Sequence, residues 1–247
     1  MTARFFNTAG PVNTEDHYYL PPLERFDLDD ILSLIDQKKY FVLHAPRQTG
    51  KTSCLLALMA HLNGTGRFRC AYVNVEPGQA AREDVRSAMR VILNETASCA
   101  RIFLKDEFPD RVWPDILERA GEYGAFGELL SQWAADAPAI PLILLIDEID
   151  SLVGDTLISF LRQIRAGYAK RPTHFPQSII LCGVRDVRDY RIHSDRDKTI
   201  ITGGSAFNIK AESLRLGNFS REEVESLYSI HTAETGQVFH PDTIDRV

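Results

Sequence analysis

The chain has 247 residues, of which 44% are hydrophobic and 25% are charged, so it is long enough for one large α/β domain with a small appendage. Its formal net charge of −6 argues against a surface that binds polyanions in general. No apolar run approaches the roughly twenty residues that span a bilayer, and the N-terminus lacks the hydrophobic core of a signal peptide. We therefore expect a cytoplasmic protein without a membrane segment. The four cysteines are scattered singly, without a zinc-binding spacing, and are expected to be buried thiols.

The first segment of the chain is polar and contains the pair Gly10-Pro11, which argues against an early helix. We therefore expect a flexible N-terminal arm over residues 1–16. An aromatic segment follows over 17–25, which two prolines make extended, and a helix capped at Asp27 comes next. The aromatic segment is placed either to cover an adenine base or to act as a hydrophobic strap that closes the edge of the core.

An apolar, β-prone stretch over 40–44 changes abruptly into the loop APRQTGKT and then into an apolar helix over 53–62. This order of strand, loop and helix is the setting of a phosphate-binding P-loop. Backbone N–H groups followed by a helix N-terminus form a concave anion site. Lys51 adds a charge between the β- and γ-phosphates, and the Thr52 hydroxyl is placed to ligate Mg²⁺. The residues expected to surround the phosphates are Pro46, Arg47, Gln48, Thr49, Gly50, Lys51, Thr52 and Ser53.

The P-loop has one departure from the general pattern, which begins with glycine where this chain has Ala45. Alanine is tolerable at that position if its backbone keeps a negative φ. The competing interpretation is an ordinary helix start on a surface loop. The β-prone stretch before the loop and the apolar helix after it favour the P-loop.

The next part of the chain alternates strand and helix. A second strand is predicted over 69–75, and a helical period runs over 84–104. Residues 105–127 are charged and are interrupted by prolines and glycines, so we expect a surface insertion there. A short helix over 128–135 leads into the next strand.

That next strand carries the second half of the predicted site, in the sequence LILLIDEID over 142–150. So continuous an apolar run is typical of a central parallel strand that is buried on both faces. Ligands bind beyond the carboxyl ends of such strands, so Asp147 and Glu148 should emerge beside the P-loop. Asp147 is then the Mg²⁺ partner of Thr52, and Glu148 is the base that polarises an attacking water. The alternative is a polar strand end that caps the next helix.

A helix over 156–170 and a fourth buried strand over 177–183 lead to three arginines spaced three residues apart. The tip of the strand beside the P-loop strand points at the γ-phosphate, so Arg185 is our candidate sensor and third catalytic residue. On a helical turn Arg185, Arg188 and Arg191 would project from one side, with Asp186 and Asp189 on the neighbouring side. A self-paired arginine–aspartate ladder on the surface is the open alternative. Arg188 and Arg191 would affect turnover only in a homo-oligomer.

The last part of the chain is expected to begin a lid. A long flexible loop through 195–204 precedes a short strand over 213–216, and Ser220 with Glu223 forms a capping box at the start of a further helix. We expect the ATPase core to cover 17–217 and a helical lid to begin over 218–247. Another helix starts at Pro241 and stops in its first turns, so we expect a longer chain, whose C-terminal part contacts a protein or DNA partner.

This order of elements resembles the AAA+ and STAND branches of P-loop ATPases. Five segments, HYYLPPLER, KYFVLHAPRQTGKT, LLIDEID, CGVRDVRDYR and NFSREEV, are similar to those of prokaryotic AAA-like ATP-binding proteins, over nearly all of residues 15–247. The resemblance implies a parallel five-stranded sheet of order 5-1-4-3-2 between helices. It implies ATP rather than GTP, since no guanine-reading N-K-x-D segment is present. It also implies that Lys51 and Thr52 bind phosphate and Mg²⁺ and that Asp147 and Glu148 complete the site, whereas the sensor asparagine or threonine of the family is not obvious.

The preferred function is Mg²⁺-dependent ATP hydrolysis that drives a conformational change in a partner or a C-terminal module. A second class is an ATP-gated switch or scaffold with little turnover. Glu148 favours hydrolysis, because a pure binder needs no base there. A third class, a small-molecule or nucleotide kinase, is disfavoured because such kinases usually lack an adjacent Asp–Glu pair at the end of a central strand.

Overall fold

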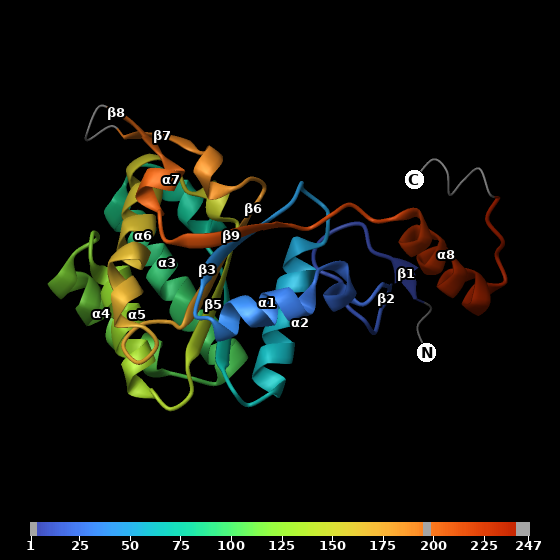
Figure 1. The fold of residues 1–247 in the computed structure, drawn as a ribbon, viewed down its shortest axis with the longest axis horizontal. Coiled ribbons are helices and arrows are strands. Elements are labelled where there is room, and N and C mark those ends of the chain that lie inside the picture. Colours follow the sequence, from blue (N-terminus) through green and yellow to red (C-terminus); the bar gives the residue numbers. More distant parts are fainter. Residues whose placement is uncertain (1–3, 195–198, 241–247) are drawn as a thin grey trace.

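The computed structural model describes residues 4–194 and 199–240. At its centre is a five-stranded sheet in which all neighbouring strands are parallel (Figure 1). Across the sheet the strands are β4 (Arg69–Asn74), β5 (Leu142–Asp147), β6 (Ser178–Gly183), β3 (Tyr40–His44) and β9 (Lys210–Arg215). Read from β9 and numbered along the chain, this order is 5-1-4-3-2, which confirms the expected P-loop NTPase fold. The expectations for 1–3, 195–198 and 241–247 lie outside the described residues.

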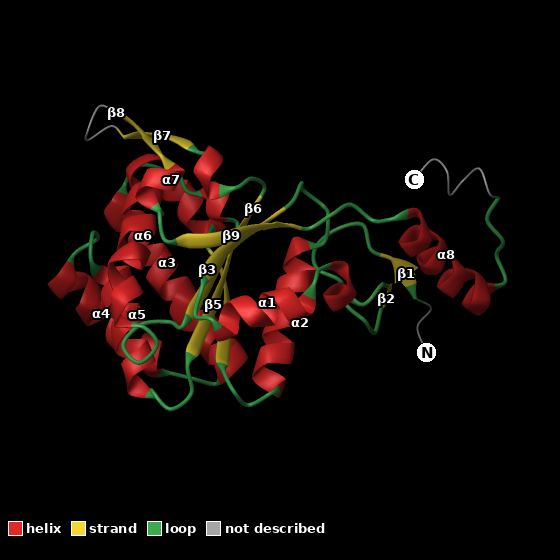
Figure 2. Ribbon diagram, viewed as in Figure 1, coloured by secondary structure: helices red, strands yellow, loops and turns green. Residues whose placement is uncertain are grey.

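Helices cover both faces of the sheet (Figure 2). On one face lie α1 (Leu28–Asp36) and α2 (Lys51–Gly64), and on the other lie α3 (Val85–Cys99), α4 (Phe108–Ala120), α5 (Ala125–Asp136) and α6 (Gly154–Gly167). Alternate residues of β3 serve the two faces, since Phe41 packs with α1 and α2 and Val42 packs with the other helices. Every residue of β5 and β6 is buried, which explains why these strands read as continuous apolar runs.

The segment predicted as a surface insertion, 105–127, is instead helical over α4 and packs against α3 and α5. Pro109 lies in the first turn of α4, where its missing N–H costs no helical hydrogen bond. Pro114 lies inside the helix, yet Ile116 and Leu117 that follow are buried in the core. The prediction is wrong because burial of these apolar side chains outweighs the unfavourable helix propensity of the prolines.

The predicted flexible loop over 195–204 is only partly described, and the described part is regular. β7 (Arg191–Ser194) and β8 (Thr199–Thr202) form an antiparallel pair, and α7 (Gly203–Ala206) follows. Ile192 and Phe207 are buried in the core on the α3–α6 side. The strand pair therefore packs against the core of the domain. The glycines in this part of the sequence had indicated a flexible loop instead.

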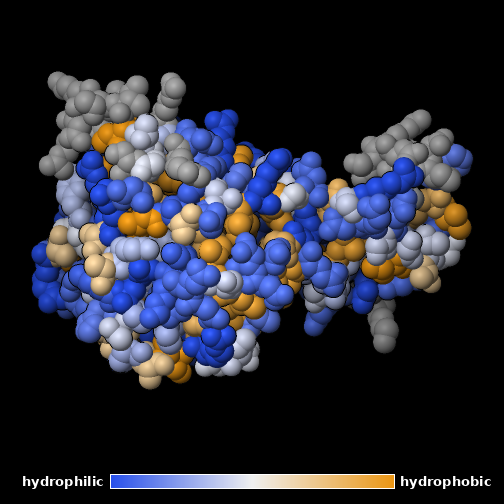
Figure 3. Space-filling view, viewed as in Figure 1, coloured by the Kyte–Doolittle hydropathy of each residue, from blue (hydrophilic) through white to orange (hydrophobic). Residues whose placement is uncertain are grey.

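The N-terminal segment and α8 (Arg221–Thr235) form a lobe beside the core (Figures 1 and 3). Within it β1 (Phe5–Phe6) pairs with β2 (His17–Tyr18), and the ring centroids of Phe6 and Tyr18 lie 5.1 Å and 5.0 Å from that of His231 on α8. Part of the segment that was expected to be a flexible arm thus has contacts in the structure, since Phe6 packs on α8. Tyr18 also packs on α8. The flexibility of 1–16 and the boundaries at 17 and 218 remain predictions.

All four cysteines are free and buried, as the sequence indicated. Among the helices of the described residues, none combines the length and the apolar character that a membrane span requires.

Candidate functional site

The loop between β3 and α2 has the backbone of a phosphate-binding loop. Gln48 and Gly50 have φ angles of 61° and 84°, and mixed left- and right-handed residues allow successive N–H groups to face one concavity. The Thr49 hydroxyl donates to the carbonyl oxygen of Pro46 at 2.8 Å and braces the loop. Ala45 is fully buried and keeps a negative φ. The condition that the sequence set for alanine at this position is therefore met.

Lys51 begins α2 and is only 6% exposed. Its Nζ atom donates to the carbonyl oxygens of Ala45 at 3.1 Å and Pro46 at 2.9 Å. The ammonium therefore lies within the loop, at the positive end of the α2 dipole. The loop and Lys51 together form a compact cationic site suited to a phosphate.

Asp147 at the end of β5 is fully buried and joins the second half of the site to the first. Its Oδ2 atom accepts hydrogen bonds from the Thr52 hydroxyl at 2.7 Å and from the Tyr72 hydroxyl at 3.0 Å. Its Oδ1 atom accepts from the backbone N–H of Glu148 at 2.9 Å. Two residues that lie 95 positions apart in the sequence are thus in direct contact, as the parallel sheet predicted.

Glu148 follows Asp147 in a left-handed backbone conformation, with φ 56° and ψ 39°. Burial raises the pKa of its carboxyl above the ordinary value, the charges of Asp147 and Asp150 raise it further, and Lys51 lowers it. The influence of Lys51 on this pKa indicates that the predicted base and the P-loop cation share one electrostatic environment. A carboxyl with a raised pKa is a stronger proton acceptor, which suits a general base.

Arg185 is exposed and lies just beyond β6. It lines a cavity of about 630 Å³ together with Asp150, Asp189 and Tyr190, and none of the described residues of that lining belongs to the P-loop. The arginines at 185, 188 and 191 do not share one helical turn, because the short helix covers only Val187–Asp189 and Arg191 begins β7. The expected helical spacing is therefore wrong, while the sensor function of Arg185 remains a prediction.

The alternative of a surface arginine–aspartate ladder is also contradicted at one position. The Lys210 ammonium of β9 donates to Asp186 at 2.6 Å, and the two side chains are 4% and 12% exposed. Asp186 is thus largely buried and pairs with a lysine of β9, which lies two strands away from β6 in the sheet.

Sequence reasoning missed two residues that organise the strand ends. Tyr72 of β4 holds Asp147, and burial and the charge of Asp147 raise the pKa of its hydroxyl, which therefore stays protonated and donates. Asp150 accepts from the backbone N–H of Val184 at 3.1 Å and so links the ends of β5 and β6. Tyrosine in a buried strand was the available signal, because its hydroxyl needs a partner.

Ser53, the last predicted phosphate-loop residue, has a different contact. Its hydroxyl accepts a hydrogen bond from the backbone N–H of Val12 at 2.9 Å. Pro46, Arg47 and Gln48 are exposed, and their side chains make none of the hydrogen bonds described above.

Comparison with solved structures supports the fold. The chain is similar to the Walker-type ATPase PABY2304 of Pyrococcus abyssi, with 14% identity, a TM-score of 0.57, and coverage of 97% of this chain and 65% of that one. Domain III of the replication initiation protein DnaA from Thermotoga maritima has 15% identity and a TM-score of 0.50, with 95% and 80% covered. Cdc6p from Pyrobaculum aerophilum has 18% identity and a TM-score of 0.50, with 86% and 48% covered.

These likenesses establish the fold alone, and the chain spans just under two thirds of the length of the P. abyssi ATPase, at 65%. No curated protein sequence matches the chain. The sequence profile of the AAA domain family matches residues 35–190, a range that holds β3, the P-loop, Asp147, Glu148 and Arg185. The chain therefore belongs to the AAA domain family, and its fold is that of the AAA+ P-loop ATPases.

Proposed function

We propose that this chain binds ATP with Mg²⁺ and hydrolyses it to ADP and phosphate. The observation that carries the proposal is the hydrogen bond of 2.7 Å between Thr52 Oγ1 and Asp147 Oδ2. It joins the start of the P-loop helix to the carboxyl end of the acidic strand. Lys51 directly precedes Thr52 in the sequence, and Glu148 directly follows Asp147. Membership in a family of ATPases supports the same activity.

Phosphate binding is the task of the loop and Lys51. The two carbonyl oxygens that Lys51 contacts, those of Ala45 and Pro46, belong to the loop itself. Since phosphate oxygens carry more negative charge than carbonyl oxygens, we expect the ammonium to exchange these contacts for the β- and γ-phosphates. The backbone N–H groups up to Thr52 and Ser53 would bind the remaining oxygens.

The residues present fit a magnesium ion. Thr52 and Asp147 supply a hydroxyl and a carboxylate oxygen, the hard ligands that Mg²⁺ prefers, already within 2.7 Å of each other. Tyr72 keeps Asp147 in place from the neighbouring strand. When bound, the ion would offset negative charge on the phosphates.

Glu148 would act on the water that attacks the γ-phosphate. Its carboxylate would accept a proton from that water as the new P–O bond forms and the bond between the γ-phosphorus and the β–γ bridging oxygen breaks, which releases ADP, and the proton later leaves with phosphate. Its position directly after Asp147 puts the base at the strand end where the phosphates are expected. Hydrolysis would then drive a conformational change in a protein or DNA partner or in a C-terminal module, within the cytoplasm.

The second candidate is an ATP-gated switch with little turnover. It is favoured by the strand tip of β6, where Asp150 Oδ1 would lie 2.7 Å from a Cβ added to Gly183. A γ-phosphate sensor is expected at this strand tip. Gly183 offers no polar side chain for that role, and the carboxylate of Asp150 fills the space beside it. The two candidates differ in rate rather than in nucleotide affinity.

The deciding experiment compares wild type with Glu148→Gln. We expect the amide to keep the shape of the site and to bind Mg·ATP as wild type does, while turnover falls by about 10²–10⁴-fold. Glu118→Gln, which removes an exposed charge on α4, is the matched control and should hydrolyse ATP normally. Wild-type turnover in Glu148→Gln would assign the base elsewhere, and a wild type that binds ATP with negligible turnover would establish the switch.

A further inference from the structure

Arg25 connects the phosphate loop to the lobe that contains α8, although the nucleotide site does not include it. It ends the short helix Pro22–Arg25, and its side chain is only 5% exposed. A guanidinium so far removed from water needs hydrogen bonds and a compensating charge. Its partners come from the P-loop, from the end of β9 and from α8.

On the P-loop side, Arg25 Nη1 donates to the carbonyl oxygen of Thr49 at 2.5 Å. The same peptide group presents the N–H of Gly50, one of the donors expected to bind phosphate. A Cβ added to Gly50 would lie 3.2 Å from Arg25 Nη1, so the guanidinium is packed directly against the turn of the loop. A cation on the carbonyl polarises the peptide and strengthens its N–H as a donor.

On the lobe side, Arg25 Nη2 donates to the carbonyl oxygen of Gly217 at 2.7 Å. Its guanidinium carbon lies 3.7 Å from the ring centroid of Phe219. Its Nε atom lies 3.7 Å from Oε1 of Glu223, on the first turn of α8. Arg25 therefore contacts the connection between β9 and α8 at Gly217 and Phe219, and the first turn of α8 at Glu223.

Glu223 ties this ion pair to the start of the helix. Its Oε2 atom accepts the backbone N–H of Ser220 at 2.6 Å, and the Ser220 hydroxyl accepts the N–H of Glu223 at 3.2 Å. This capping box sets where α8 begins. One carboxylate thus both starts α8 and compensates the cation behind the phosphate loop.

The lobe has few other supports. No described residue of α8 is buried, and α8 packs on the N-terminal segment through Phe6, Tyr18 and the ion pair Arg4–Glu234. That segment reaches the P-loop helix through the Val12–Ser53 hydrogen bond. Within the described residues, the contacts of Arg25 and Val12 therefore join the lobe to the P-loop and its helix.

We propose that Arg25 is a positioning residue that couples the phosphate loop to α8, so that nucleotide binding and the orientation of α8 change together. This rests on the proposed nucleotide binding at Lys51. Phosphates in the loop are a second source of negative charge near Arg25, and they weaken its need for Glu223. Because coupling is reciprocal, the contact with Glu223 in turn tunes the affinity of the loop for nucleotide.

The orientation of α8 can be measured by the distance between labels on the helix and on the core. Ser226→Cys on α8 and Asn94→Cys on α3 are exposed attachment sites, and the four native cysteines are buried. The distance distribution is recorded with and without a non-hydrolysable ATP analogue and Mg²⁺, and binding of the analogue is measured separately by calorimetry. We expect the analogue to shift the distribution in the Arg25 protein and to leave it unshifted in Arg25→Gln, which still binds the analogue.

A charge-only variant tests the same coupling without altering the loop. Glu223→Gln keeps the cap acceptor and removes the charge near Arg25, so we expect its affinity for the analogue to change by at least about fivefold. Glu225→Gln is the matched control, because Glu225 lies on the same helix and pairs with Arg221 instead. Its affinity should equal that of wild type. Should Arg25→Gln fail to fold, Arg25→Lys and Glu223→Gln carry the test.

The outcomes separate this inference from the proposed function. If calorimetry finds no binding of the analogue to the wild-type chain, the proposed function is wrong. If the analogue binds and α8 responds equally in wild type and Arg25→Gln, or does not respond in either, the coupling is wrong. Arg25 is then a purely structural contact, which would lower thermal stability without altering the nucleotide response.

Discussion

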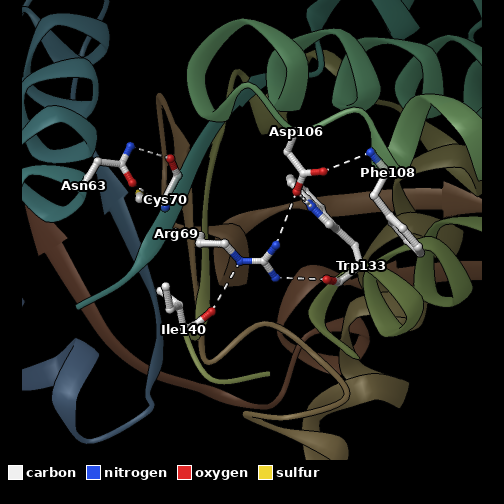
Figure 4. Close-up of polar contacts among 7 residues, drawn as sticks. All are labelled: Asn63, Arg69, Cys70, Asp106, Phe108, Trp133 and Ile140. Atoms are coloured by element: carbon white, nitrogen blue, oxygen red, sulfur yellow. Dashed lines mark hydrogen bonds and ion pairs between the residues drawn. The ribbon is translucent and has the colours of Figure 1, made fainter. Parts of the chain in front are cut away.

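The central sheet has poorly exposed charged side chains at two places: at the edge where its strands begin, called here the N-terminal edge, and at the edge where they end, called the carboxyl edge. The partners of these side chains differ between the two edges. At the N-terminal edge, Arg69 donates to Asp106 and to the backbone carbonyl oxygens of Trp133 and Ile140 (Figure 4). Asp106 also accepts from the indole N–H of Trp133 at 2.7 Å and from the backbone N–H of Phe108 at 2.9 Å. Each charged group is enclosed by partners from several elements.

At the carboxyl edge, Lys51 is more deeply buried than Arg69, yet its described contacts are carbonyl oxygens of its own loop. An ammonium held by neutral acceptors has more to gain from an anion than a guanidinium that already faces a carboxylate. Burial of a charged side chain therefore does not by itself identify a binding site. The nature of the partners distinguishes the structural network from the ligand site.

The largest effect is expected from Lys51→Ala. Loss of the ammonium that is expected to face the β- and γ-phosphates should abolish ATP binding, while the network around Arg69 keeps the fold intact. Calorimetric titration with Mg·ATP measures the affinity, and Lys170→Ala, an exposed lysine, is the control that should bind normally. Unchanged affinity in Lys51→Ala would remove the P-loop assignment.

A substitution of Arg185 tests whether the proposed nucleotide site includes this residue beyond β6. If it senses the γ-phosphate, Arg185→Ala should lower turnover at least about a hundredfold, since arginines that act on a transferred phosphoryl group contribute about 10³–10⁵. ADP affinity should stay nearly intact. Steady-state hydrolysis over a range of protein concentration checks this and also shows whether Arg188→Ala or Arg191→Ala acts through a neighbouring subunit. A wild-type rate in Arg185→Ala at every concentration would restrict Arg185 to the cavity that it lines.

The hydrogen-bond network around Arg69 is tested by Asp106→Ala. The variant leaves Arg69 and the Trp133 indole without their shared acceptor, so we expect a loss of about 2–3 kcal/mol in the free energy of unfolding, with unchanged nucleotide affinity. Asp110→Ala, which removes an exposed partner of Arg101, should cost under about 1 kcal/mol. Chemical denaturation measures both, and a drop in nucleotide affinity in Asp106→Ala would mean that the two edges are not independent.

The smallest effect concerns pH. The pKa of Glu148 is raised above its ordinary value of 4.5, and only the deprotonated carboxylate is a base, so turnover should fall with decreasing pH at a midpoint above that value. Asp150→Asn removes a like charge and should move the midpoint to lower pH. Above the raised pKa the charged carboxylate costs stability, so Glu148→Gln should be no less stable than wild type at neutral pH. An acid midpoint at or below 4.5 would contradict the proposed environment.

Much of the proposed site at the carboxyl edge could be predicted from the sequence, because the local sequence pattern and the sheet topology agree there. A glycine that must adopt a φ of 84° and a lysine at the start of a helix are set by the loop itself. The contact of Thr52 with Asp147 follows once both strands are recognised as parallel and buried. Such residues are predictable since each is placed by its own element.

Other features were decided only by tertiary structure. The prolines of 105–127 indicated an irregular segment, and the burial of Ile116 and Leu117 made it a helix. The spacing of Arg185, Arg188 and Arg191 suggested one helical face, and the pairing of β7 with β8 placed Arg191 on a strand. In both cases contacts distant in the sequence outweighed the local preference.

Arg25 shows the same limit at the level of a single side chain. Its sequence neighbours mark a short turn after two prolines, and nothing local distinguishes it from an exposed arginine. Its partners Thr49, Gly217 and Glu223 come from three separate segments that meet only when the sheet is assembled. The proposed roles of the phosphate loop and the acidic strand end could be predicted from the sequence, because each lies within a single element. The link between that loop and α8 was decided by the tertiary structure, because it depends on how distant elements pack together.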